Sequence, residues 1–190
     1  MQTSVDILYQ FARLLESLGI RYVVVGSFAS SARGRPRATI DADIVAEVTR
    51  THAHLLAEHL ASEYYLDENA IRRAVQERGR FNAIHLETMF KVDVYVSSST
   101  GFDQEQLLRR VPEHVKPEST YLVYVATAED TVLAKLVWFR KGAGVSERQW
   151  LDVLGVLGIQ KGQLDIDYLN KWAANLGVSD LLEKAMSETK

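Results

Sequence analysis

The stretch Val23-Val24-Val25-Gly26-Ser27 places an apolar, β-branched run directly before a Gly-Ser turn. Such a run is typical of a buried strand, and the turn after it predicts the start of a helix. The unpaired backbone N–H groups and the dipole of a helix N-terminus favour a phosphate group at that position. Gly26 and Ser27 are therefore candidate phosphate-binding residues, although Gly26 can also serve simply as a tight-turn residue.

Two carboxylates follow in residues 39–45, which read Thr-Ile-Asp-Ala-Asp-Ile-Val. In a strand, the period of two puts Asp41 and Asp43 on one face and turns Ile40 and Ile44 to the other face. Neighbouring carboxylates repel one another unless a cation lies between them. Mg²⁺ suits one or two carboxylates combined with substrate phosphates. The alternative interpretation is that both aspartates are solvated strand ends.

A third carboxylate lies in residues 90–96, which read Phe-Lys-Val-Asp-Val-Tyr-Val. The alternation puts Asp93 on the opposite face from Val92 and Val94. This strand can lie beside the strand over 39–45. Asp93 would then join Asp41 and Asp43 in a site for two Mg²⁺ ions.

In this order, the motifs resemble the DNA polymerase β-like nucleotidyltransferase superfamily. Its signature is a strand, Gly-Ser or Gly-Gly, a short helix, Asp-x-Asp or Asp-x-Glu, and an aspartate on a later strand. The matching residues are Gly26, Ser27, Asp41, Asp43 and Asp93. The thirteen residues between Ser27 and Asp41 are a long spacing for the family, and we expect the extra length to form a loop.

The resemblance extends into the C-terminal part of the chain. Residues 128–136 and 148–153 are similar to the helical half of AbiEii-like, toxin-type nucleotidyltransferases. Together with the motifs above, the resemblance covers most of residues 20–155.

The resemblance implies a Mg²⁺-dependent enzyme that transfers a nucleoside monophosphate from a nucleoside triphosphate (NTP) to a hydroxyl acceptor and releases pyrophosphate. Asp41 and Asp43 would hold the metals, and Asp93 would share one and help deprotonate the acceptor. Gly26 and Ser27 would fix the β- and γ-phosphates.

The acceptor stays open among RNA such as tRNA, a protein and a small molecule, and a toxin or antitoxin protein is a candidate partner. A catalytically silent nucleotide-binding or partner-binding module of the same fold, antitoxin-like, is the alternative. A plain interaction domain with accidental acidic strand ends is a third interpretation.

Further cations lie near these motifs. Arg33, Arg35 and Arg37 follow the phosphate turn, and one or two of them can bind the triphosphate or an acidic acceptor, because guanidinium groups suit phosphate. A solvated loop explains them equally well. Lys135 lies among apolar residues of a helix predicted over 128–141, where it either snorkels to the surface or points toward phosphate. The resemblance favours a phosphate contact for Lys135, and we count Arg37 and Lys135 with the nucleotide-binding residues.

Other polar residues have weaker claims to a functional role. Arg148 and Asp152 are four apart on a helix and can form a simple intrahelical pair, whereas the resemblance implies a role for Asp152 in activity. The spacing of His52, His54 and His59 does not match a zinc motif, so we expect these histidines to face solvent.

The composition restricts the class of protein. The 190 residues are 47% hydrophobic and include no cysteine, which excludes disulfides, thiolate zinc sites and a cysteine nucleophile. A net charge of −3 argues against a protein that coats nucleic acid. Residues 1–19 lack the basic region of a signal peptide, and no apolar run reaches membrane-spanning length, so we expect a cytoplasmic protein without membrane contact.

The hydrophobic periodicity predicts an α+β fold with a mixed sheet flanked by helices, followed by a C-terminal helical part. We expect a nucleotidyltransferase-like core over residues 1–126 and a helical subdomain over 127–190. The predicted strands are 21–25, 39–45, 81–86, 89–96 and 121–125. The predicted helices are 5–18, 28–33, 52–64, 68–78, 102–110, 128–141, 147–157, 166–176 and 180–187.

Overall fold

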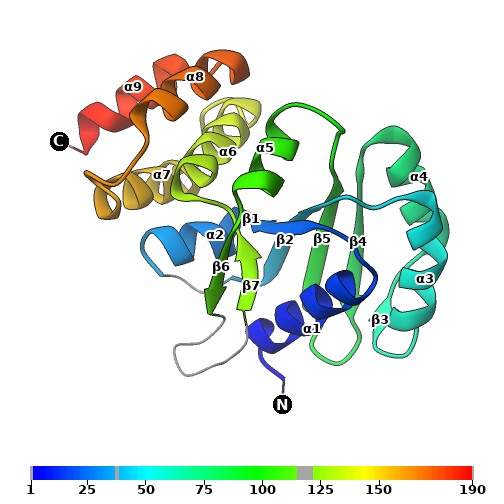
Figure 1. Cartoon of the computed structure of the whole chain (residues 1–190). Coiled ribbons are helices and arrows are strands. Elements are labelled where there is room, and N and C mark those ends of the chain that lie inside the picture. Colours follow the sequence, from blue (N-terminus) through cyan, green and yellow to red (C-terminus); the bar gives the residue numbers. More distant parts are fainter. Residues whose placement is uncertain (1, 37–38, 115–121, 190) are drawn as a thin grey trace. The chain divides into compact units, whose positions relative to one another are not determined.

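The computed structural model describes residues 2–36, 39–114 and 122–189 (Figure 1). Their helices are α1 (Ser4–Ser17), α2 (Gly26–Arg33), α3 (Arg50–Leu60), α4 (Glu68–Glu77), α5 (Phe102–Arg109), α6 (Ala128–Lys141), α7 (Glu147–Ile159), α8 (Ile166–Leu176) and α9 (Ser179–Glu188). Their strands are β1 (Tyr22–Val25), β2 (Asp41–Ala46), β3 (Tyr64–Tyr65), β4 (Arg80–His85), β5 (Lys91–Val96), β6 (Val111–His114) and β7 (Leu122–Val125). Each predicted strand and helix overlaps one of these elements.

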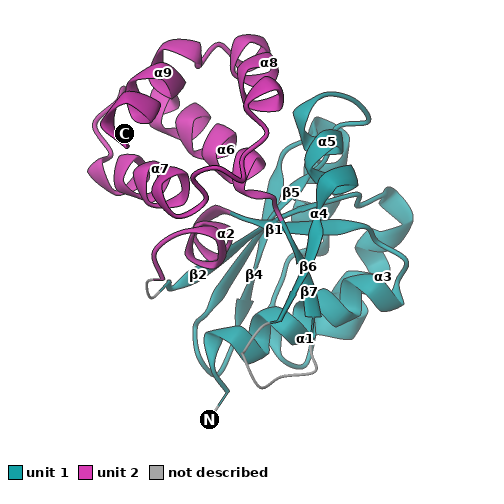
Figure 2. Cartoon of the chain, turned by 60° about the vertical axis from the view of Figure 1, so that its left-hand side comes forward, with its two compact units in different colours: residues 1–25, 39–125 teal, residues 26–38, 126–190 magenta. Residues whose placement is uncertain are grey.

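The chain divides into two compact units, which Figure 2 shows in teal and magenta. The first unit contains Met1–Val25 and Thr39–Val125, and it holds the whole sheet. The second unit contains Gly26–Ala38 and Ala126–Lys190. Helix α2 therefore groups with the C-terminal helices α6 to α9.

The sheet of the first unit has the strand order β3-β4-β5-β2-β1-β7-β6 among the described residues. The pairs β2–β5 and β1–β7 are parallel, and the other neighbours are antiparallel. The sheet is therefore mixed, as the sequence predicted, and together with the helices it defines an α+β fold.

Alternation of side chains gives the inner strands one fully apolar face. Val92 and Val94 on β5 and Ile44 on β2 are completely buried, and Ala42 on β2 is nearly so. The helices of this unit contribute apolar sides to the same core. For example, Ile7, Leu8 and Phe11 of α1 are buried. A capping box fixes the start of α1, because Thr3 and Asp6 exchange hydrogen bonds with each other's backbone N–H groups.

Three local expectations for the sheet were wrong or incomplete. Ile40 precedes β2 and is 85% exposed, so it does not share the buried face with Ile44. The short strand Tyr64–Tyr65 replaces the end of the predicted helix 52–64. Strand Val111–His114 was not predicted, because a polar edge strand with a proline lacks the usual apolar alternation.

In the second unit, α2 packs against α7 through a close contact at Gly34, which directly follows α2. A Cβ atom at Gly34 would lie 2.9 Å from the Ser30 carbonyl oxygen and 3.0 Å from the Val156 backbone nitrogen. Farther along the unit, the Tyr168 hydroxyl donates to the buried Asp130 carboxylate at 2.5 Å, which links α8 to α6. No helix in the described ranges is both long and apolar enough to cross a membrane.

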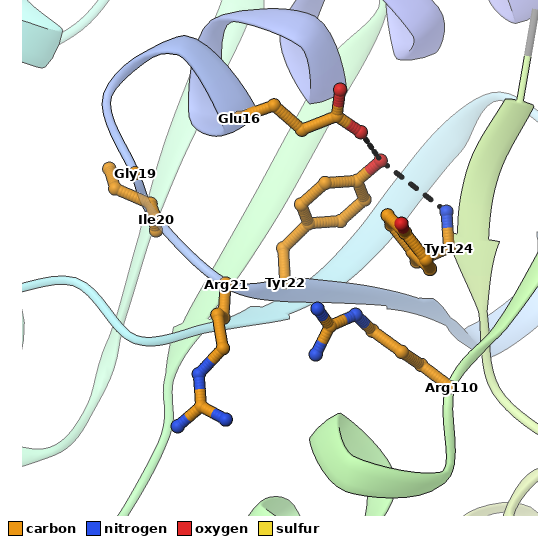
Figure 3. Close-up of a pocket in the computed structure, with 7 residues that line it drawn as sticks. All are labelled: Glu16, Gly19, Ile20, Arg21, Tyr22, Arg110 and Tyr124. Carbon is orange, nitrogen blue, oxygen red and sulfur yellow. Dashed lines mark hydrogen bonds between the residues drawn. The ribbon is translucent and has the colours of Figure 1, made fainter.

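A cavity of about 210 Å³ lies in the first unit beside Tyr22, at the end of β1 away from Gly26 (Figure 3). The Tyr22 hydroxyl donates to Glu16 at 3.0 Å and accepts from the Tyr124 backbone N–H at 3.3 Å. Burial raises the pKa of Tyr22. The Arg110 guanidinium lies 4.6 Å from the centre of the Tyr124 ring. These contacts tie α1, β1 and β7 together.

Gly34→Ala is expected to destabilise the protein by about 1–3 kcal/mol, because the added methyl group meets backbone atoms that cannot move independently. Gly158→Ala on α7 is the control, since its Cβ meets no atom within 4 Å. The control should be neutral or stabilising by up to about 1 kcal/mol. Urea unfolding of both variants gives the free energies, and equal midpoints would contradict the close contact.

Tyr22→Phe is expected to cost about 1–3 kcal/mol, because it leaves the Tyr124 N–H and a Glu16 oxygen without the hydroxyl. Tyr65→Phe, at the exposed residue of β3, removes the same group from a solvated position and should change stability by less than about 0.5 kcal/mol. Thermal unfolding of the two variants side by side measures the difference.

Candidate functional site

The parallel pairing of β2 with β5 brings the predicted carboxylates together. In this register Asp43 is the direct partner of Asp93, and Asp41 is the direct partner of Lys91. Partners in register project from the same face of a sheet, and the period of two keeps Asp41 on that face as well. The three aspartates therefore form one acidic row, which we call the carboxylate row.

Burial differs along the carboxylate row. Asp93 is 5% exposed, whereas Asp41 and Asp43 are half-buried. The Thr39 hydroxyl lies 2.8 Å from the Asp41 carbonyl oxygen and 3.2 Å from its Oδ1 atom, so it can donate to either and hold the start of β2. Burying a charged carboxylate to this depth destabilises the folded protein unless a cation or a hydrogen-bond donor compensates the charge.

Lys91 supplies a cation within the row itself. Its Nζ atom lies 2.6 Å from Oδ2 of Asp93. The Asp93 carboxylate raises the pKa of the Lys91 ammonium, and Asp41 adds to the effect. The sequence interpretation did not include Lys91, although its place two residues before Asp93 on an alternating strand is visible in the sequence.

A second group of polar residues lies on the other side of β5. Asn82 on β4 is the register partner of Asp93, and Arg80 is the partner of Tyr95. The hydrogen bond from Arg80 to Tyr95, together with the charges of Asp93 and Asp43, raises the pKa of Arg80. Sequence reasoning missed these residues, because only the register of the β4–β5 hairpin shows that they neighbour the acidic row.

The residue types of the row suit a hard divalent cation, which prefers oxygen ligands. The short contact with the Lys91 ammonium shows that Asp93 already attracts positive charge. In the described part of the chain, however, no three His, Cys, Asp or Glu side chains are gathered closely enough to form a ready metal site. The aspartates therefore suit a metal ion by their chemistry and by their shared face. A metal bound to Asp93 would lie next to the Lys91 ammonium.

The phosphate turn begins directly after β1. Val25, the last residue of β1, is the register partner of Asp43, and Gly26 follows it in the chain. Gly26 has φ +62°, a left-handed conformation that favours glycine. Gly26 and Ser27 lie in the first turn of α2, which begins two residues before the predicted helix start at Phe28.

Lys135 takes part in a buried ion pair of the second unit. Its Nζ atom lies 2.8 Å from Oδ2 of Asp152, and the two side chains are only 6% and 10% exposed. The Ser30 hydroxyl also lies 3.3 Å from that Asp152 oxygen, so the pair joins α6, α7 and α2. Asp152 therefore has partners on two other helices, so its role is not limited to an intrahelical pair with Arg148. A contact between Lys135 and phosphate stays a prediction.

The arginines after the phosphate turn differ from one another. Arg33 lies at the end of α2, where its Nε donates to the Ala126 carbonyl oxygen at 3.0 Å, so it is not part of a solvated loop. Arg35 is exposed, and its side chain passes close to Gly155 of α7. Arg37 lies outside the described residues.

The histidines of α3 make separate local contacts. His52 Nδ1 accepts from the Thr49 backbone N–H at 3.2 Å, and His54 lies 3.4 Å from Glu68. His59 Nδ1 lies 2.8 Å from the Leu55 carbonyl oxygen. The three histidines therefore have different local partners; His54 and His59 are exposed, as expected, whereas His52 is half-buried.

Solved nucleotidyltransferases have the same fold. The antibiotic-resistance factor ANT(2'')-Ia matches with a TM-score of 0.61 and 13% identity, covering 97% of both chains. An antigenic nucleotidyltransferase-like protein from Paracoccidioides brasiliensis matches with a TM-score of 0.59 and 16% identity, covering 97% of this chain and 92% of that one. The lincomycin-bound lincosamide antibiotic adenylyltransferase LnuA matches with a TM-score of 0.50 and 15% identity, covering 80% of this chain and 95% of that one.

These likenesses show a nucleotidyltransferase fold over nearly the whole chain. No protein-family model matches the sequence, and no curated protein matches it. The superfamily resemblance is therefore supported at the level of the fold, and the AbiEii-like subtype stays a prediction.

Single replacements in the Lys135–Asp152 pair, Lys135→Met and Asp152→Asn, are each expected to destabilise the protein by about 3–5 kcal/mol, because each leaves a buried charge without its counter-charge. The double replacement should cost clearly less than the sum. Unfolding free energies of the four proteins give the coupling energy. The exposed pair Arg13–Glu16 is the control and should couple by less than about 1 kcal/mol. Additive costs at Lys135 and Asp152 would contradict a coupled pair.

Proposed function

We propose that the protein transfers a nucleoside monophosphate from an NTP to a hydroxyl acceptor with the help of Mg²⁺. The single observation that supports this most strongly is the register of β2 and β5, which sets Asp43 beside Asp93 with Asp41 on the same face. The nucleotidyltransferase fold supports the same reaction class. Fold alone does not define function, so the carboxylate row carries the proposal.

The reaction forms a bond between the acceptor oxygen and the α-phosphorus, and it breaks the bond between the α-phosphorus and the bridging oxygen to the β-phosphate. Pyrophosphate leaves. Asp93 is the candidate to receive the acceptor proton, since it is the most buried carboxylate of the row. Asp41 and Asp43 would serve as metal ligands, Asp93 would share one of the metals, and a bound Mg²⁺ pair would supply charge neutralisation for the phosphates.

The phosphate contacts are assigned to other residues of the chain. Gly26 and Ser27 would donate backbone and hydroxyl hydrogen bonds to the β- and γ-phosphates, because they lie in the first turn of α2. Arg37 and Lys135 are the proposed cationic contacts to the triphosphate. For Lys135, such a contact requires that the ammonium be shared with or released from Asp152.

A small hydroxyl compound is the first acceptor to test. LnuA is described as a lincosamide antibiotic adenylyltransferase bound to lincomycin, and ANT(2'')-Ia as an antibiotic-resistance factor with substrate-regulated conformation dynamics. These descriptions favour a small-molecule acceptor for this chain over RNA or protein. A toxin–antitoxin role with a protein partner stays part of the proposal.

A catalytically silent module of the same fold is the second candidate. One observation favours it, because the Lys91 ammonium already neutralises Asp93. A silent module would still bind an NTP but would transfer nothing. The experiment below separates the two candidates.

Asp43→Asn is expected to lower transfer at least about 100-fold, since it removes one charge from the centre of the carboxylate row. Its stability should be unchanged or slightly higher, because repulsion between Asp43 and Asp93 is relieved. The assay follows label from α-labelled ATP, GTP, CTP and UTP with Mg²⁺ into RNA, protein and small-molecule fractions. Asp167→Asn, the same change at an exposed position on α8, is the control and should keep full activity.

Label in one fraction, missing with Asp43→Asn and retained with Asp167→Asn, supports the enzyme and names the acceptor class. Full transfer by Asp43→Asn would contradict the mechanism. NTP binding without any transfer by the wild-type protein would favour the silent module.

A further inference from the structure

We propose that Lys91 is a built-in counter-cation of the carboxylate row, which neutralises Asp93 in the metal-free protein and competes with a divalent metal for that carboxylate. The inference rests on the proposed function, because both concern the same aspartates. It adds a positioning residue that the sequence motifs do not include.

The position of Lys91 follows from the sheet geometry. Lys91 is the register partner of Asp41 and lies two residues before Asp93 on the same face of β5. Its Nζ atom lies 2.6 Å from Oδ2 of Asp93, and the two side chains are 36% and 6% exposed. One ammonium group is thus next to the deepest carboxylate and near a second one.

A metal ion and the Lys91 ammonium cannot both occupy the same position beside the Asp93 carboxylate. Mg²⁺ binds carboxylate oxygens at about 2.0–2.1 Å, and two cations on one carboxylate repel each other strongly. We therefore expect Lys91 to leave Asp93 when a metal binds there. Its flexible four-carbon stem is partly exposed and allows the ammonium to swing away while the strand stays in place.

The triphosphate would give the released ammonium a new partner. Without a nucleotide, a metal has to displace Lys91, whose ammonium then loses its direct carboxylate partner. With a nucleotide, the ammonium exchanges a carboxylate for a phosphate oxygen at little cost. Lys91 would thereby make metal binding depend on the nucleotide.

Arg80 offers a matched control for the charge alone. It lies on the same face, beyond β5, and its side chain donates a hydrogen bond to Tyr95. Replacing Arg80 removes one positive charge near the row without removing the cation that lies on Asp93. Comparing Lys91→Met with Arg80→Met therefore separates direct competition for Asp93 from the general effect of one positive charge near the row.

The test measures Mn²⁺ binding without nucleotide, by electron paramagnetic resonance, for the wild-type protein, Lys91→Met, Arg80→Met and Asp43→Asn. Lys91→Met is expected to bind Mn²⁺ at least about tenfold more tightly than the wild type, and Arg80→Met only about twofold to threefold more tightly. The thermal midpoint of metal-free Lys91→Met should fall, and Mn²⁺ should restore it.

An affinity for Lys91→Met no higher than that of Arg80→Met would overturn the inference. If the wild type binds Mn²⁺, Asp43→Asn does not, and Lys91→Met matches the wild type, only the role of Lys91 fails. If neither the wild type nor Lys91→Met binds Mn²⁺ without nucleotide but both bind it with an uncleavable NTP analogue, only the inference fails; if neither binds it even then, the proposed function fails as well.

A second measurement uses the wild-type protein and does not depend on the folding of a variant. Lysine acylation followed by mass spectrometry compares the protein with and without saturating Mn²⁺. Lys91 should react faster with the metal, because its ammonium leaves the carboxylate, whereas exposed Lys171 on α8 should not change. An unchanged rate at Lys91, while Mn²⁺ raises the thermal midpoint, would contradict the proposal.

Discussion

The register between β2 and β5 is the constraint on which the candidate site depends. It sets Asp43 directly beside Asp93, although like charges in register destabilise a sheet. The opposite face fixes this register, because Ala42 and Ile44 pack there with Val92 and Val94 in the buried core. A slip by one residue would turn these apolar side chains out of the core. The core thus holds the acidic row in place, and Lys91 compensates part of its repulsion.

Much of the fold follows from periodicity in the sequence. Period-two runs gave the inner strands, and the helix signals gave α8 with its bounds, because its N-cap Asp165 and C-cap Gly177 are both local features. The start of β2 is not determined by its own residues. Asp41 begins the strand because its partner β5 begins at Lys91, and Ile40 is therefore left exposed. Strands β3 and β6 likewise depend on their neighbours β4 and β7.

The candidate site could be predicted only in part, because alternation along a strand is a local feature and the pairing between strands is not. The faces of Asp41, Asp43 and Asp93 follow from alternation along single strands, and the structure places all three on one face. Asn82 and Arg80 join them only through cross-strand register, which a single sequence does not give, whereas Lys91 shares the face of Asp93 by alternation along β5. The pairing of Lys135 with Asp152 and Ser30 joins three helices, and periodicity says only which helix face each occupies. The catalytic roles stay predictions.

The most direct measurement is anomalous diffraction from crystals grown with Mn²⁺ and an ATP analogue that cannot be cleaved between the α- and β-phosphates. A carboxylate row that exchanges its lysine for metal predicts an Mn²⁺ peak within ligand distance of Asp41 and Asp43. The Lys91 ammonium should then have moved from Asp93 to a phosphate oxygen. Bound nucleotide with no metal at the row, and with Lys91 still on Asp93, would contradict the proposed chemistry.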